Sequence, residues 1–154
     1  NGKIVFDYKN KKYFSGLVDL NSSVINFAYG RLKFSNQTKI AGAKINCLGE
    51  SSLTEEFPRL NFICEINTQD KKKFLKKFSL SDKDKESLDL KVEGSINLLR
   101  KKINFEKISG PNNYRANDED LNFFKEKFEN KLFSDNIFGM FDKEKIKFFL
   151  LEII

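Results

Sequence analysis

The feature that most constrains the fold of this chain is an alternation of apolar and polar residues with a period of two. In residues 60–66 every second residue is apolar, and in residues 88–98 every second residue is apolar or Gly. Similar short segments recur through most of residues 4–106. A strand places successive side chains on opposite faces, so these segments predict β-strands with one apolar and one polar face. Few helical segments separate them, which favours antiparallel meanders over parallel βαβ units.

One short helix is expected within this strand region, at residues 70–78. Asp70 is a suitable N-cap, and Phe74, Leu75 and Phe78 recur at helical spacing. Five Lys residues occupy the remaining positions of the segment. They predict either a basic site for anionic headgroups or phosphates, or a solvated surface around a helix held by its two Phe side chains.

The period changes to 3.6 after a Gly-, Pro- and Asn-containing turn at residues 109–113. Residues 118–132 and 142–154 carry apolar residues at helical spacing, with a short turn expected at residues 134–141 between them. We therefore expect a mainly β, α+β fold. Its residues 1–110 form a curved antiparallel sheet with one short inserted helix, and two to three helices in residues 111–154 cover the sheet as a C-terminal cap.

Composition argues against most enzyme classes. The 154 residues include no His, which excludes His-based triads, His metal ligands and imidazole acid–base chemistry. Ser51 lacks both a Gly-x-Ser-x-Gly setting and a base, and no Gly-rich phosphate loop is present. We expect no catalytic residue, no metal site and no cofactor, and no segment is long and apolar enough to span a bilayer as a helix.

The two cysteines, Cys47 and Cys64, both fall in the apolar phase of their strands. A hairpin centred on Leu53 would place Ala43 opposite Cys64 and Cys47 opposite Leu60. The sulfur atoms would then lie roughly 13 Å apart, at about 3.3 Å per residue, too far for a disulfide. This register predicts two free, buried thiols.

The charge of +6 gives limited support for a nucleic-acid partner. Only four of the 28 basic residues are Arg, the residue whose fork matches bases and phosphates, and the chain is rich in Lys, Asn, Ile and Phe. These four residue types share A/T-rich codons, so a biased genome accounts for the composition without a selected partner. Nucleic-acid binding is therefore the least favoured of three hypotheses.

The apolar sheet face and the last helix supply the candidate binding residues. The last helix carries seven large apolar residues in residues 146–154, more than packing on one sheet requires, so one strip of them is expected to point outward to lipid or a partner. The candidates on the face and on this strip are Phe14, Val18, Ile45, Leu60, Phe62, Leu90, Val92, Ile96, Phe105, Phe148, Leu151 and Ile154.

The order of these elements resembles the C-terminal region of the AsmA-like family of Gram-negative envelope proteins. The resemblance lies in the strand opened by Pro58-Arg59-Leu60-Asn61-Phe62 and in the Leu88-Asp89-Leu90-Lys91-Val92-Glu93-Gly94-Ser95-Ile96 strand followed by Lys102-Ile103-Asn104-Phe105-Glu106-Lys107-Ile108. The helical segment beginning Leu121-Asn122-Phe123-Phe124 resembles that of marine alphaproteobacterial members. The family combines an N-terminal membrane anchor with a long periplasmic array of amphipathic strands.

The resemblance implies a non-enzymatic envelope protein that handles phospholipid or another acyl lipid, or assists outer-membrane assembly. It implies a location on the periplasmic side of the inner membrane, with the membrane surface or envelope proteins as partners. Because residue 1 is Asn rather than Met, we expect this chain to be a fragment of a longer one. The alternative hypothesis is a structural or protein-interaction module whose helices cover the sheet fully and which has no lipid role.

Overall fold

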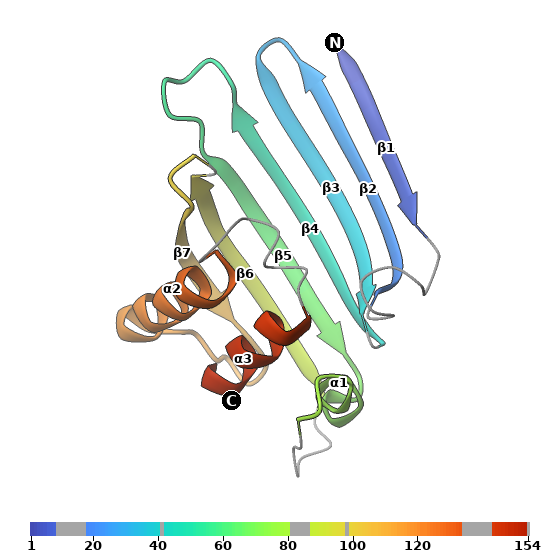
Figure 1. Ribbon diagram of the computed structural model, residues 1–154. Helices are drawn as coiled ribbons and strands as arrows, with labels where there is room; N and C mark the ends of the chain where they lie inside the picture. Colours follow the sequence, from blue (N-terminus) through green and yellow to red (C-terminus); the bar gives the residue numbers. More distant parts are fainter. Residues whose placement is uncertain (9–17, 41, 81–86, 98, 134–142, 154) are drawn as a thin grey trace.

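The protein is a single antiparallel sheet of seven strands with helices on one side, seen in the computed structural model of Figure 1. The structure describes residues 1–8, 18–40, 42–80, 87–97, 99–133 and 143–153. The expected α+β fold is confirmed. The elements are β1 (Gly2–Tyr8), β2 (Val18–Ala28), β3 (Arg31–Ile40), β4 (Ala43–Ser52), β5 (Leu60–Thr68), α1 (Lys71–Lys77), β6 (Leu88–Asn97), β7 (Lys102–Ser109), α2 (Asp118–Leu132) and α3 (Lys143–Ile153).

The strands follow one another across the sheet in sequence order, so every strand pairs with its neighbour in the chain. The tightest described connection is Tyr29-Gly30, between β2 and β3, where both residues have positive φ. Two such residues form a type I′ turn, whose twist matches that of the flanking strands. This local connectivity is the meander that the alternating sequence predicts.

The register of the pairs sorts the side chains onto two faces. We call the face on which the helices pack the inner face, and the opposite, mostly charged and amide-bearing face the outer face. A register shift between Val18 and Leu20 places these two residues on opposite faces, although a simple alternation would place them together. The apolar residues of the inner face are Ile4, Phe6, Val18, Ile25, Phe27, Leu32, Phe34, Ile40, Ala43, Ile45, Leu60, Phe62, Ile66, Leu88, Leu90, Val92, Ile96, Ile103, Phe105 and Ile108.

Helix α2 packs against β7 through aromatic side chains. Phe128 contacts Phe105 of β7 edge-to-face, with ring centroids 5.7 Å apart, and contacts Phe149 of α3 at 5.8 Å. Ile103 of β7 and Phe133, the C-cap of α2, are almost fully buried at this junction. The Asn117 side chain caps the helix in a capping box with Asp120. The turn expected before α2 is confirmed, since Asn112 and Asn113 both have positive φ.

Helix α1 closes the end of the inner face where β4 begins. The Asp70 side chain accepts a hydrogen bond from the Lys73 backbone N–H, as the sequence predicts for an N-cap. Phe74, Leu75 and Phe78 pack with Ala43 of β4 to form the buried core cluster. Ile146 and Leu150 of α3 pack against this cluster, so α3 bridges α1 and α2. The short turn expected at residues 134–141 lies outside the described residues, as does Asp142, the first residue of the last expected helical segment.

The expected pair of free thiols is wrong, because Cys47 and Cys64 form a disulfide. The two residues are direct partners in the β4–β5 register, with Cα atoms 4.1 Å apart. The predicted register differs from the observed one by four residues, so the centre of the connection lies about two residues beyond Leu53. The end of β4 stays paired with the start of β3, and the backbone N–H of Leu53 donates to Gly30 O at 2.7 Å. The turn into β5 therefore lies farther along the chain than Leu53.

Candidate functional site

The candidate site is the part of the inner face over β1, β2 and β3, which we call the open half. Figure 1 shows α2 and α3 in front of the opposite side of the sheet, near β5 to β7. Ile4 is 43% exposed and Phe6 is 57% exposed, and the other apolar side chains of this area are half-buried. The open half consists of Ile4, Phe6, Ile25, Phe27, Leu32 and Phe34.

Most of the candidates from sequence lie on the inner face but are not among the six residues of the open half. The register places Val18, Ile45, Leu60, Phe62, Leu90, Val92, Ile96 and Phe105 together on the inner face. Val18 and Phe62 are buried, and Phe105 is occupied by its contact with Phe128. Phe14 and Ile154 lie outside the described residues.

Two apolar residues of the open half, Ile25 and Phe27, were missed by the sequence reasoning. That reasoning ended the second strand at Leu20, whereas β2 continues to Ala28. The signal was present, because Ser23, Ile25 and Phe27 share one phase and precede the Tyr29-Gly30 turn. A strand bounded by a two-residue turn extends up to that turn.

A polar cluster interrupts the open half between its apolar residues. The Asn36 side-chain amide donates to Asn21 Oδ1 at 2.7 Å and to Ser23 Oγ at 2.6 Å. The Thr38 hydroxyl donates to Asn21 Oδ1 at 2.8 Å. These part-buried groups satisfy one another's hydrogen bonds, which lowers the cost of covering them with an apolar ligand. They also show that the inner face is not uniformly apolar, which the alternation of Leu32 and Phe34 alone does not reveal.

Phe and Gly alternate in one row across the inner face. The row runs Phe34, Gly49, Phe62, Gly94 and Phe105 on five successive strands. A Cβ atom built on Gly49 would collide with the ring of Phe34, and one built on Gly94 would meet Phe62 Cζ at 3.1 Å. The absence of a side chain at the two Gly residues therefore leaves room for the neighbouring Phe rings on the inner face.

The last helix presents an apolar strip outward. Phe148 and Leu151 are 53% and 54% exposed, while Phe149 contacts Phe128 and Leu150 contacts the core cluster. The helical phase of residues 146–154 predicts that Phe149 and Leu150 face the sheet. Phe149 instead contacts Phe128 of α2, because α3 packs against both α1 and α2.

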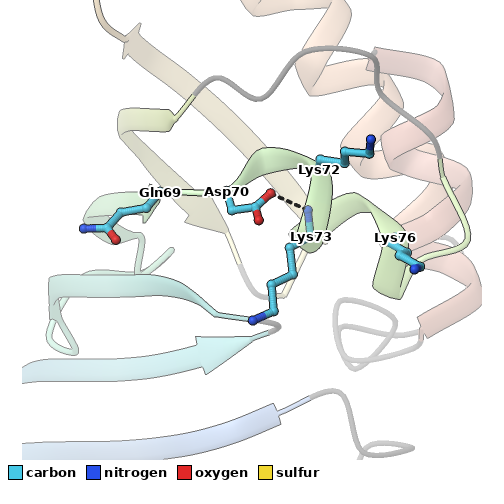
Figure 2. Close-up of a pocket in the computed structure, with 5 residues that line it drawn as sticks. All are labelled: Gln69, Asp70, Lys72, Lys73 and Lys76. Carbon is cyan, nitrogen blue, oxygen red and sulfur yellow. Dashed lines mark hydrogen bonds between the residues drawn. The ribbon is translucent and has the colours of Figure 1, made fainter.

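Three lysines of α1, Lys72, Lys73 and Lys76, line a shallow pocket with Gln69 and Asp70. Figure 2 shows the side chains of Lys72, Lys73 and Lys76 pointing in different directions from the short helix. Three ammonium groups that do not converge cannot chelate one phosphate together. The arrangement therefore supports the solvated-surface interpretation of this segment over the anion site.

Glu152 of α3 forms ion pairs with two lysines of α2. Lys127 Nζ donates to Glu152 Oε2 at 2.7 Å, and Lys131 lies 3.6 Å from the other carboxylate oxygen. The hydrogen bond from Lys127 lowers the pKa of the Glu152 carboxyl below its ordinary value and raises the pKa of Lys127. This is a solvent-exposed contact between the two helices.

Among the described residues, no helix combines the length and apolarity that crossing a membrane requires. The same residues contain no group of three or more His, Cys, Asp or Glu side chains placed to hold a metal ion. Comparisons with protein-family models, curated proteins and solved structures found no significant match to this chain.

Proposed function

We propose that this protein is a non-enzymatic lipid-handling protein that binds acyl chains along the open half of its inner face. The observation that carries the proposal is the exposure of Ile4 and Phe6 beside four half-buried apolar residues on a face that the described helices cover only in part. Apolar surface left in water is unfavourable, so such a patch favours an apolar ligand.

The chemistry of the open half suits an extended acyl chain. Each methylene group transferred from water to an apolar surface gains about 0.8 kcal/mol, so a chain lying across several strands gains a useful affinity without any charged contact. The hydrogen-bonded cluster around Asn36 leaves few unpaired polar groups beneath the ligand.

A location in the cell envelope is part of the proposal. The Cys47–Cys64 disulfide supports it, because disulfides persist in oxidising compartments such as the periplasm. The resemblance to the AsmA-like family supports the same compartment and a role on the periplasmic side of the inner membrane, in lipid transport or outer-membrane assembly. The expected partners are a phospholipid or other acyl lipid and the envelope membranes or proteins that supply it.

The test is flotation of the purified protein with phosphatidylcholine vesicles, with and without phosphatidylglycerol, at low and high salt. The test variant replaces Phe27 and Leu32, neighbours on β2 and β3 in the open half, by Ser. The control variant replaces Leu48 and Ile63, which are neighbouring exposed residues on the outer face, by Ser. Thermal melts establish that both variants are folded.

We expect the wild-type chain and the Leu48→Ser/Ile63→Ser control to float with neutral vesicles even at high salt. The Phe27→Ser/Leu32→Ser variant should float several-fold less, because it loses apolar contact area on the binding face only. Binding restricted to phosphatidylglycerol vesicles and released by salt would indicate attraction to the basic chain instead. No flotation of the wild-type chain would overturn the proposal and favour the structural-module alternative.

A further inference from the structure

The two edge strands of the sheet, β1 and β7, differ in the contacts that other parts of the chain make with their backbone groups. At the β7 edge, the backbone N–H of Ile103 donates to Glu129 Oε1 of α2 at 3.0 Å. Farther along β7, Ala116 N donates to Ile108 O at 2.9 Å, and Ser109 forms a β-bridge with Arg115. The polar backbone groups of this edge are thus partly engaged, which limits pairing with another strand.

The β1 edge has none of these contacts among the described residues. Strand β1 pairs only with β2 and ends the sheet on the opposite side from β7. Ile4, Val5 and Phe6 are three consecutive apolar residues, and Val5 is 50% exposed on the outer face. Edge strands that remain single are usually interrupted by an inward charge, a Pro or a bulge. The centre of β1 has no such interruption.

The sequence of β1 is complementary to itself about Val5. If two copies of the strand align antiparallel with Val5 opposite Val5, then Lys3 of each copy faces Asp7 of the other, and Ile4 faces Phe6. This register places opposite charges together on the outer face and apolar side chains together on the inner face. Both Lys3 and Asp7 are exposed in the single chain.

From this complementarity we propose that two copies of the protein associate through their β1 edges into one continuous antiparallel sheet. The two-fold axis passes between the Val5 residues, perpendicular to the sheet, so both inner faces lie on the same side. The open halves of the two copies then meet, with Ile4 and Phe6 of each at the junction. A contact of seven residues per strand is smaller than a standard stable interface, so the dimer is a concentration-dependent one.

The experiment is sedimentation velocity of the full chain over a range of concentrations, in the absence of lipid. The single variants Lys3→Asp and Asp7→Lys each place like charges opposite one another at two symmetric positions. We expect each to weaken the dimer about tenfold or more. The double variant Lys3→Asp/Asp7→Lys exchanges the charges and should restore the wild-type dissociation constant. This recovery is expected only if residue 3 of one copy faces residue 7 of the other.

The matched control is Leu48→Asp, which adds a charge at an exposed apolar position of the outer face on the central strand β4. It should leave the dissociation constant unchanged. A chain that stays monomeric at all concentrations overturns the proposal. So does a dimer that both single variants leave intact, or one that the double variant fails to restore. Two single variants are used because one of them could fail to fold. Circular dichroism detects such a defect, and the variant that does fold then tests the proposal. Because lipid is absent, the result is independent of the proposed lipid binding.

Discussion

Single Gly residues leave room for neighbouring side chains and strands on the inner face of the sheet. Gly49 and Gly94 lie opposite Phe residues on both neighbouring strands, in the alternating row that crosses the sheet. An isolated Gly within a strand typically indicates a bulge or a bend. Gly94 does lie at a register shift between β6 and β7, whereas Gly49 lies in regular pairing and is required by the adjacent Phe34 ring. The same residue type thus serves two different steric purposes.

We predict that Gly49→Ala and Gly94→Ala each destabilise the protein by about 1–3 kcal/mol. The new methyl group at residue 94 would collide with the backbone carbonyl of Asn104, which cannot rotate away, so this substitution should cost more. At residue 49 the Phe34 ring can move, but Asn61 O lies 2.7 Å from the new atom. Urea denaturation measures both changes.

Gly2→Ala is the control, since a Cβ at residue 2 has no neighbour within 4 Å. It should change the free energy of unfolding by less than about 0.5 kcal/mol. If Gly94→Ala were as stable as Gly2→Ala, the close approach of β6 and β7 described above would be incorrect.

At the scale of elements, the three helices form one connected group that covers one part of the sheet. Helix α1 contributes the core cluster with Ala43, α2 contributes Phe128 and its contact with β7, and α3 joins the two through Leu150 and Phe149. The Lys127–Glu152 pair adds an exposed polar contact at the α2–α3 junction. The position of α3 depends on both neighbours, and this explains why its apolar residues divide between contacts and solvent.

The two sides of α3 should respond differently to polar substitution. We predict that Ile146→Ser/Leu150→Ser lowers stability by several kcal/mol, because each truncation of a packed side chain costs about 2–5 kcal/mol. Phe148→Ser/Leu151→Ser should alter stability by less than about 1 kcal/mol, since both side chains are more than half exposed. Thermal unfolding monitored by circular dichroism separates the two results, and equal losses would contradict the orientation of the helix.

At the scale of the whole molecule, the disulfide links the two parts of the sheet. Cys47 lies on β4, which borders the open half, and Cys64 lies on β5, which borders the strands under the helices. The bond closes a loop with a sequence separation of 17 residues between strands that are already paired. It therefore fixes the β4–β5 register in the folded chain, and in the unfolded chain it keeps Cys47 and Cys64 joined and lowers the conformational freedom of the segment between them.

We predict that reduction, or the Cys47→Ala/Cys64→Ala variant, lowers the free energy of unfolding by about 3 kcal/mol. A loop of this length has lost roughly that much conformational freedom in the unfolded state. Guanidinium denaturation with and without reductant measures the difference. Intact mass under non-reducing conditions should show a monomer lacking two hydrogens, and titration of two free thiols in the untreated protein would contradict the bond.

The sequence by itself determined the local structure of this protein. Alternation identified most strands and the side chains that share a face, because the period of two depends only on backbone geometry. Asp70 identified the start of α1, and the change to a period of 3.6 identified α2 and α3, because caps and helical spacing involve residues close in the chain.

Only the tertiary structure decided the register and the coverage of the sheet. A shift of four residues between β4 and β5 leaves every side chain on the same face, so alternation could not distinguish Cys47 opposite Leu60 from Cys47 opposite Cys64. The end of β4 pairs with the start of β3, which moves the turn into β5 beyond Leu53 and so places Cys47 opposite Cys64. Likewise, Phe6 and Phe105 both lie in the apolar phase of their strands. Phe105 is covered by Phe128 of α2 whereas Phe6 is exposed, and this difference follows from where α2 packs. Both decisions rest on contacts between residues distant in sequence, which no local pattern contains.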